Sequence, residues 1–348
     1  MGKGATKKEY SKGLSKENAS LPTMMGTLFV FCAYILWGIT PLYTQFLEQV
    51  SVLEVISHRV LWSLPGVFFA IVYFSGGLSL LKDTLKNPKA VGMLVFSATI
   101  LAVHWGFFIY ALLTRQGFLT SFSYFVTPVI SVFLGSVFLK ERLNHLQIIA
   151  ALLIILSLLI MTLHSGIPLL SLAIAVTWSA YCFARKTIPV GSSEGFFIEM
   201  CVLAIPALFY VVWNGFSGGE HFFLGNIPDT LFLIGYGLLN SFVFCIFSYG
   251  IKRAKLSTVG IMEYTAPLLM IVSSVFILKQ PIDTVRTIVF GIVVIAMVVY
   301  LLPTVINSGN MPKKFFWQIL FFFFKFCVYS TFFLSFFNAS DYFISYRC

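Results

Sequence analysis

The chain of 348 residues is 59% hydrophobic and only 10% charged, whereas soluble domains carry roughly 25% charged residues. A soluble chain of this length could not bury so much apolar side chain, so the composition excludes a water-soluble globular protein. The net charge of +10 does not indicate nucleic-acid binding, because the basic residues lie in short segments between apolar runs and form no basic patch with interleaved aromatics.

The first segment, residues 1–23, is polar and rich in Lys, Ser and Gly, and we predict a cytoplasmic tail. The apolar run after it exceeds the roughly 7–15 residues of a signal-peptide core and lacks a small-residue cleavage site, so we expect a retained membrane span. A spanning helix needs about 20 mostly apolar residues. Ten runs meet this requirement, at residues 24–46, 54–74, 90–112, 117–139, 146–163, 167–184, 194–213, 230–251, 257–278 and 285–303.

Each run is predicted to be an α-helix, because a segment in lipid must satisfy its own backbone hydrogen bonds and barrel strands would be shorter and alternate in polarity. Lys and Arg mark alternate connections between the runs. With a cytoplasmic N-terminus, 17 of them fall in the tail and the inner connections, and only Arg115, Lys279 and Arg286 fall outside. This asymmetry predicts that both ends of the ten-span region are cytoplasmic.

A weak internal repeat relates the two halves of this region. Pro128 in the fourth run and Pro267 in the ninth are 139 residues apart, and the same offset relates Tyr110 to Tyr249. With five spans each, the halves enter the membrane in opposite directions, as in inverted-repeat secondary transporters whose substrate site lies near the midplane. We therefore expect an all-α integral membrane protein with two inverted five-helix repeats, and we expect both prolines to kink their helices. The predicted repeats are residues 24–163 and 167–303.

The remaining segment, residues 304–348, is a linker followed by a Phe-rich extension. Its apolar run, residues 315–337, contains Lys325 near the middle. An eleventh span would place this ammonium group in hydrocarbon at a cost of about 2.5–3.5 kcal/mol unless it reaches the interface. An extra membrane helix, an interfacial segment and an extension without function all stay open.

Ionisable residues inside the runs are functional candidates, because each must face a partner or a cavity. Arg59, which follows His58 in the second run, is either an anion- or dipole-binding group or an arginine that extends to the interface. Glu199 and Glu263 are candidates for carrying a coupling proton or pairing with a cationic substrate, and a structural hydrogen bond is the alternative for each. His104 is either a packing residue or a proton relay.

Polar and aromatic side chains inside the runs predict a pathway suited to an amphipathic or aromatic solute. The pathway candidates are Trp37, His58, Arg59, His104, Trp105, Tyr110, Trp178, Tyr181, Glu199, Asn240, Tyr249, Glu263 and Tyr264. Ser131 and Gly135 form a small-xxx-small pair, which predicts close helix approach either within the molecule or in a homodimer.

No catalytic, nucleotide-binding or metal-binding motif is present: the sequence lacks HExxH, GxSxG, GxxxxGK[ST] and a GxGxxG after a strand. The six cysteines form no CxxC pair and no metal spacing with histidine. We therefore expect no metal and no cofactor. An ATP-driven pump on this chain is disfavoured, which leaves a transporter driven by gradients.

Five stretches carry a family resemblance. They are AYILWGITPLY (Ala33 to Tyr43), EVISHRVLWS (Glu54 to Ser63), FLKERL (Phe138 to Leu143), YCFARKTIPVG (Tyr181 to Gly191) and LSTVGIMEYTAP (Leu256 to Pro267). In this order they resemble the RarD-type permeases of the EamA branch of the drug/metabolite transporter superfamily. The resemblance implies a ten-helix inverted-repeat transporter in a bacterial inner membrane, and the family name is associated with chloramphenicol sensitivity.

The sequence departs from this family pattern at three places. Glu263 stands where relatives often have glutamine, residues 240–245 read NSFVFC instead of a Thr-rich run ending in proline, and residues 304–348 have no counterpart. The leading hypothesis is a secondary exporter of a small organic metabolite or drug that works by alternating access and is coupled to protons if Glu199 or Glu263 titrates. An intramembrane enzyme and a channel are the alternatives.

Overall fold

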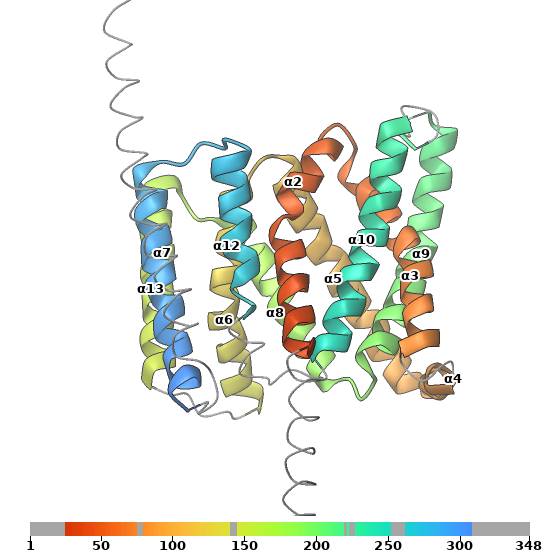
Figure 1. The fold of residues 1–348 in the computed structure, drawn as a ribbon, viewed down its shortest axis with the longest axis horizontal. Coiled ribbons are helices and arrows are strands. Elements are labelled where there is room, and N and C mark those ends of the chain that lie inside the picture. The colour runs from red at the N-terminus through yellow and green to blue at the C-terminus, as the bar shows by residue number, and fades with distance from the viewer. Residues whose placement is uncertain are drawn as a thin grey trace, which may run out of the picture. The chain divides into compact units, whose positions relative to one another are not determined.

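The computed structural model describes residues 25–74, 79–139, 145–218, 221–222, 227–251 and 262–307, and these residues form helices and no strand (Figure 1). The predicted tail and the Phe-rich run with Lys325 lie outside the described residues, as do the side chains of Ser131 and Gly135, so the predicted homodimer contact stays a prediction. The chain divides into two compact units. The first comprises residues 1–134 and 170–280, and the second residues 135–169 and 281–348.

The first unit contains most of the helices. They are Met25–Gly38, α2 (Thr40–Thr44) with the 3₁₀ turn Gln45–Leu47, α3 (Val52–Phe74), α4 (Ser79–Leu85), α5 (Pro88–Leu113), α6 (Gly117–Leu139, as far as Leu134), α8 (Leu169–Thr187, from Leu170), α9 (Ser192–Phe216), α10 (Ile227–Ile251) and α12 (Thr265–Val272), which continues into the π-helical turn Ser273–Ile277. The second unit contains α7 (His145–Ser165) and α13 (Thr284–Asn307).

Five of these helices are long and apolar enough to cross a bilayer: Val52–Val72, Pro88–Leu113, His145–Ser165, Ser193–Phe216 and Ile227–Phe247. The bent pair Met25–Gly38 and Thr40–Leu47 makes a sixth if its two parts form one span. The remaining predicted runs coincide with the shorter apolar helices Gly117–Ile130, Leu169–Arg185, Thr265–Ile277 and Thr284–Tyr300. The chain is thus a polytopic α-helical membrane protein, and the count of ten spans stays a prediction.

Proline positions differ in what they do to the backbone. The first helix bends by 42° where Pro41 lies in the first turn of α2, because proline supplies no backbone N–H to the preceding turn. Pro128 lies inside α6, whereas Pro267 lies in the first turn of α12, just after a turn at Glu263 and Tyr264. The kinks predicted at Pro128 and Pro267 stay predictions, and the measured bend is at Pro41.

The helix starts follow local capping rules. The Ser51 hydroxyl accepts the Glu54 N–H at 3.2 Å and caps α3, and Asn87 Oδ1 accepts the Ala90 N–H at 3.2 Å ahead of Pro88, the first residue of α5. Such caps satisfy donors that a helix start leaves free. They fix where α3 and α5 begin and therefore which of their side chains face the interior.

Helix α3 is central in the first unit, where it packs against α5, α9 and α10. Its contact with α10 depends on glycines: a Cβ at Gly237 would lie 3.0 Å from the His58 carbonyl oxygen, and one at Gly66 would lie 2.7 Å from Ser241 Cβ. A close approach of two helix backbones requires such small residues. The polar side chains of α3 therefore lie directly against α10.

In the second unit α7 packs along α13. The buried side chains of α7 recur at helical spacing, at Ala150, Ile154, Ser157 and Met161. Asp283 caps α13 by accepting the Arg286 N–H at 2.8 Å, and its other oxygen lies 3.3 Å from His164 Nε2. Partial burial raises the pKa of Asp283, but the hydrogen bonds from Arg286 and His164 outweigh this and lower the pKa below its usual value.

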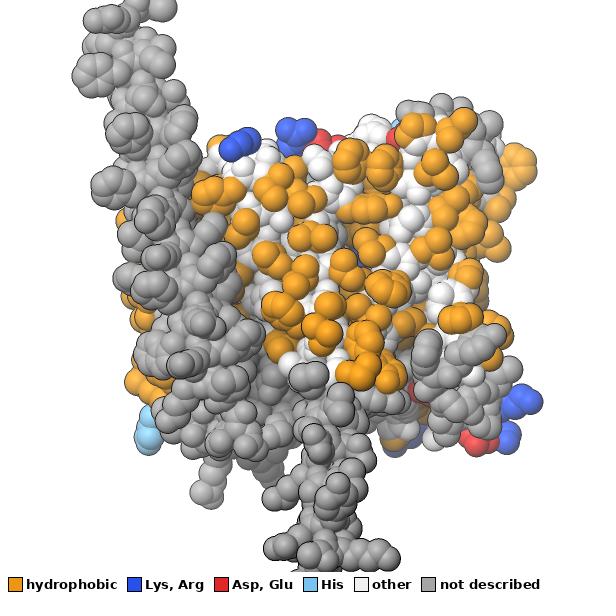
Figure 2. Space-filling view, viewed as in Figure 1, with side chains coloured by type: hydrophobic (Ala, Val, Ile, Leu, Met, Phe, Trp, Pro, Cys, Tyr) orange, Lys and Arg blue, Asp and Glu red, His pale blue; other side chains and the backbone are white. Residues whose placement is uncertain are grey.

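The outer surface of the helices is apolar. Exposed side chains include Leu152, Ile155 and Leu159 on α7, and Ile205 and Phe209 on α9. Figure 2 shows hydrophobic side chains over the middle of the helices, while Lys and Arg lie near helix ends. This distribution suits a surface in contact with lipid acyl chains.

Candidate substrate-binding site

Arg59 lies in the interior of the first unit, on α3, and its side chain is held by neutral groups. Only 6% of the residue is exposed. Nη1 donates to the Tyr236 hydroxyl at 3.2 Å and Nη2 to Asn240 Oδ1 at 2.7 Å. The guanidinium carbon lies 4.2 Å from the ring centre of Trp105 and 5.0 Å from that of Tyr236. Arg59 is therefore a buried cation.

No acidic side chain in the described part of the chain pairs with Arg59, and its Nε atom is buried without a hydrogen-bond partner there. Taking a cation out of water is costly unless an opposite charge or several acceptors compensate. The Trp105 and Tyr236 rings offset part of this cost because their faces are electron-rich, but they leave the positive charge in place. The guanidinium group thus contacts no opposite charge among the described residues.

A second layer of polar groups orients Asn240. Its Nδ2 donates to the Ser63 hydroxyl at 3.0 Å, and the Ser63 hydroxyl lies 2.6 Å from the Arg59 carbonyl oxygen and 3.0 Å from that of Gly237. Because the Asn240 N–H group is engaged in this way, its amide oxygen faces the guanidinium group. The polar contact between α3 and α10 is therefore preorganised.

His58, next to Arg59, is also buried without a hydrogen-bond partner among the described residues. It is 2% exposed, and both ring nitrogens lack a partner. Its ring stacks on Phe222, with 4.2 Å between ring centres. One turn further along α3, the buried Nε1 of Trp62 also lacks a partner. Unsatisfied donors thus gather within one turn of α3.

His104 on α5 belongs to an aromatic cluster. Its Nδ1 lies 3.2 Å from the Thr177 hydroxyl and its Nε2 lies 3.4 Å from the Tyr124 hydroxyl. The ring centre of Trp178 is 5.0 Å away, and Tyr124 is in edge contact with Trp178. His104 is therefore hydrogen-bonded at both nitrogens, as expected for a packing residue in a polar aromatic wall.

Glu199 on α9 lies in a second buried polar cluster and is 0% exposed. It accepts hydrogen bonds from the Ser97 hydroxyl and, at 3.0 Å, from the Tyr181 hydroxyl, and it lies 3.7 Å from Arg185 Nε. The Tyr181 ring also contacts Trp178, with 5.5 Å between centres. This carboxylate is thus compensated by one cation and two hydroxyl groups, in contrast to Arg59.

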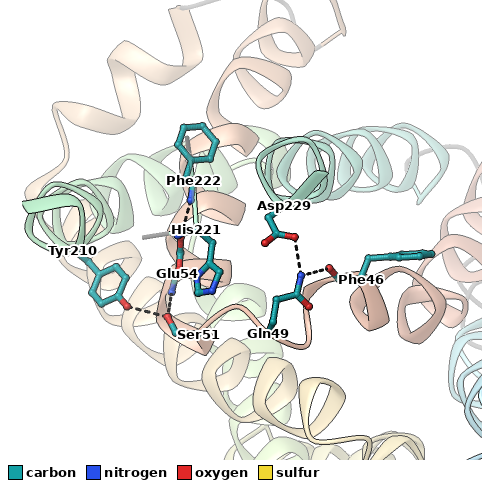
Figure 3. Close-up of polar contacts among 8 residues, drawn as sticks. All are labelled: Phe46, Gln49, Ser51, Glu54, Tyr210, His221, Phe222 and Asp229. Carbon is teal, nitrogen blue, oxygen red and sulfur yellow. Dashed lines mark hydrogen bonds and ion pairs between the residues drawn. The ribbon is translucent and has the colours of Figure 1, made fainter. Parts of the chain in front are cut away.

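A third cluster surrounds Glu54 at the start of α3 (Figure 3). This carboxylate is 1% exposed. It accepts the backbone N–H groups of His221 and Phe222 at 2.7 Å and 3.2 Å, and lies 3.1 Å from His221 Nδ1. Glu54 therefore holds Phe222 against the His58 ring.

Neighbouring contacts join the same region to α9 and α10. The Tyr210 hydroxyl lies 3.0 Å from that of Ser51, and the Gln49 Nε2 donates to Asp229 at 2.7 Å (Figure 3). The helix ends around Glu54 are thus linked by side chains from three helices and the loop before α3.

The contacts of several other predicted pathway residues do not involve Arg59. Trp37 packs against aromatic rings of α10, and Tyr249 packs edge-on against Phe29. Tyr264 is buried and stacks with Phe125. Tyr110 is 47% exposed. Glu263 is accessible and does not pair with Arg59, but the charges of Arg59 and Glu263 both act on the Tyr124 hydroxyl, so the two residues lie in the same region of the interior. The structure therefore joins Arg59, Trp105 and Asn240, joins His104 to Trp178, and joins Glu199 to Tyr181.

Several residues of these clusters were not among the candidates read from the sequence. Tyr236 stands four residues before Asn240 and Ser63 four after Arg59, so helical spacing could have found both. Ser97 and Thr177 gave no signal, because hydroxyls are common in membrane helices. Glu54 lies at the edge of its apolar run and Arg185 was counted as a cytoplasmic charge.

The helices and these buried polar clusters are those of a polytopic membrane protein with a polar interior. The model of the EamA-like transporter family matches residues 24–163 and again residues 164–302. The chain belongs to this family, and it is a membrane transporter of the drug/metabolite superfamily built from two copies of the family domain.

Curated relatives agree with this assignment. The chain is 30% identical over 275 residues to protein RarD of Streptomyces exfoliatus, covering 79% of this chain and 87% of that protein. It is 29% identical over 294 residues to protein RarD of Escherichia coli, covering 84% and 98%, and 30% identical over 289 residues to the uncharacterized transporter YojE of Bacillus subtilis, covering 80% and 94%. A solved crystal structure has a TM-score of 0.57 at 19% identity, covering 82% of this chain and 98% of that one, which concerns the fold alone.

Proposed function

We propose that this protein is a secondary transporter that moves a small organic metabolite or drug out of the cell across a bacterial inner membrane by alternating access. The observation that carries the proposal is the buried Arg59 among Trp105, Tyr236 and Asn240, which forms no ion pair with the described residues. A charge of this kind inside a membrane protein is costly, and a solute that compensates it explains why it is kept. The chain has no nucleotide-binding motif, so gradients supply the energy.

We propose further that ten helices form two inverted repeats with a cytoplasmic N-terminus. In the order of helices within the two copies of the family domain, α9 corresponds to α3, and α10 corresponds to α5. The contact of α3 with α10 then has its counterpart in the contact of α9 with α5, and both contacts are found. The contact of α3 with α9, which is also found, is its own counterpart. Exchanging the two repeats maps this set of contacts onto itself, which supports a two-fold relation between them.

The polar clusters supply candidate gates for alternating access. Glu54 and the loop residues His221 and Phe222 lie on the side predicted to be outside, whereas Glu199 and Arg185 lie on the side predicted to be cytoplasmic. Breaking one cluster while the other holds would open Arg59 to one side at a time. This is the motion that rocking of one repeat against the other requires.

Proton coupling is a finer part of the proposal. Glu199 supports it, because it is a fully buried carboxylate, and Glu263 is the second candidate. Replacing each by Gln would flatten the dependence of flux on pH. An unchanged pH dependence in both variants would remove proton coupling and leave the transporter in place.

The experiment that tests the function is flux in proteoliposomes. Purified protein is reconstituted with solutes of differing charge under imposed pH, sodium and potential gradients, and uptake is compared with protein-free vesicles. We expect saturable, solute-dependent flux. No flux with any solute under any gradient would contradict the proposal, and unitary currents would indicate a channel instead.

A further inference from the structure

We infer that Arg59 binds an anionic group of the transported solute, a carboxylate or a group of the same charge and shape, and that the solute has an apolar or aromatic body. This inference rests on the proposed transport function and names its substrate class. It excludes organic cations as preferred solutes.

The buried charged side chains differ in whether they contact an opposite charge. Glu199 has a cation at 3.7 Å and Glu54 has the His221 ring at 3.1 Å, whereas the hydrogen-bond partners of the Arg59 guanidinium group among the described residues are a phenol and an amide. An amide oxygen and a phenol oxygen accept hydrogen bonds but carry no opposite charge. The missing charge is therefore the feature that a bound anion would supply.

The N–H groups of Arg59 are not all engaged in hydrogen bonds with the described residues. A guanidinium group has five N–H groups, and carboxylates bind it most strongly through two parallel hydrogen bonds. The contacts of Arg59 engage Nη1 and Nη2, and no described residue is a hydrogen-bond partner of Nε. The His58 ring and Trp62 Nε1, within one turn on α3, also lack partners among the described residues. Arg59 Nε can donate to an oxygen of a bound anion.

The aromatic rings around Arg59 suit an apolar or aromatic solute body. The Trp105 and Tyr236 rings lie against the guanidinium group, and His104 and Trp178 extend the aromatic surface from α5 to α8. Aromatic rings offer apolar faces that pack against planar or aliphatic groups. A positive charge next to these rings disfavours a solute cation by direct repulsion.

Access of a solute to Arg59 requires a change of conformation. Arg59 and His58 are both buried, so a solute enters only after a rearrangement. Phe222 covers His58 and is itself held through its backbone by Glu54 (Figure 3). Release of Phe222 from Glu54 would uncover His58, the residue next to Arg59. His221 and Phe222 thus lie between His58 and Glu54, which is on the side predicted to be outside.

The test uses the full-length protein in nanodiscs and three probes of similar size: phenylacetate, its neutral amide phenylacetamide, and the cation phenethylamine. Binding is measured by thermal shift and by quenching of tryptophan fluorescence, neither of which depends on transport. We expect phenylacetate to bind at least about tenfold more tightly than either other probe, which corresponds to one charge-assisted hydrogen bond.

Asn240→Asp is the decisive variant, because it places a carboxylate beside Arg59 Nη2 and supplies the missing charge from within the protein. It is expected to stay folded and to lose phenylacetate binding by about 10- to 100-fold. Arg59→Gln should lose binding similarly, and Arg115→Gln, which removes an exposed cation paired with Glu48, should bind as the wild type does. A folded Asn240→Asp protein that binds phenylacetate like the wild type would overturn the inference.

The result also separates this inference from the proposed function. Transport of neutral or cationic solutes that Asn240→Asp leaves unchanged would refute anion binding and keep the transporter. Selective phenylacetate binding without any flux would support the anion site and count against transport.

Discussion

Arg59 Nη2 lies 2.7 Å from Asn240 Oδ1, so a buried cation of α3 is held by a neutral amide of α10 and not by a carboxylate. The same amide donates to Ser63 at 3.0 Å. Asn240 therefore compensates Arg59 by hydrogen bonding alone, and the positive charge stays available to a bound anion. Substitutions at this residue separate the structural contribution of the contact from its contribution to binding.

Asn240→Leu should destabilise the protein by about 1–3 kcal/mol, because it leaves Arg59 Nη2 without its acceptor in the interior and removes the donor to the Ser63 hydroxyl. Asn240→Asp should raise Tm, since it pairs the buried cation. The measurement is thermal unfolding in a fixed detergent or nanodisc. A lower Tm for Asn240→Asp than for the wild type would contradict the assignment of Arg59 as an uncompensated cation.

Glu54→Gln should loosen the loop that carries His221 and Phe222, because an amide replaces one carboxylate oxygen with a donor and removes the charge. The expected loss is about 1–3 kcal/mol, with faster hydrogen exchange at the His221 and Phe222 amides. The matched control is Tyr210→Phe, which removes only the exposed contact with Ser51 and should change stability by less than about 0.5 kcal/mol. Equal exchange rates in both variants would show that Glu54 does not hold the loop.

Arg185→Gln should be strongly destabilising, by about 3 kcal/mol, because it leaves the buried Glu199 carboxylate without a cation. Adding Glu199→Gln removes the stranded charge, so the double variant should recover part of the lost stability. Thermal unfolding of the wild type, both single variants and the double variant gives the coupling. Strictly additive losses would mean that the 3.7 Å contact contributes nothing.

The α7–α13 unit should lose stability in acid through Asp283, whose folded pKa is lowered. A lowered acid pKa stabilises the fold at pH values above the unfolded pKa of about 3.9, and this contribution is lost as the pH falls through the folded pKa. Asp283→Asn keeps a cap on α13 and should flatten this acid limb of the pH profile. Because Asp283 is 42% exposed at its side chain, the effect is small. An acid limb unchanged by Asp283→Asn would assign it to other carboxylates.

The sequence predicts the helices well and the partners of their polar residues poorly. Each of the ten apolar runs between residues 24 and 303 overlaps a helix of the described residues, because run length and backbone satisfaction in lipid are local properties. Arg59 and Asn240 were both candidates, but their direct contact depends on the approach of α3 to α10 at Gly66 and Gly237, which only the fold sets.

The sequence also does not predict the partners of polar residues at helix ends. Arg185 was counted among the cytoplasmic charges, yet its side chain reaches Glu199 on the next helix. Glu54 lies at the edge of its run and gave no signal, because its partners are backbone N–H groups of a loop more than 160 residues away. Long-range hydrogen bonds to backbone leave no pattern in one sequence.

The most direct test of the account is solute flux into proteoliposomes that contain wild-type protein, Arg59→Gln or Arg115→Gln. The account predicts flux of an organic anion with the wild type and with Arg115→Gln, and little or none with Arg59→Gln reconstituted at equal density. Full flux through Arg59→Gln, or no flux through the wild type under any gradient, would contradict it.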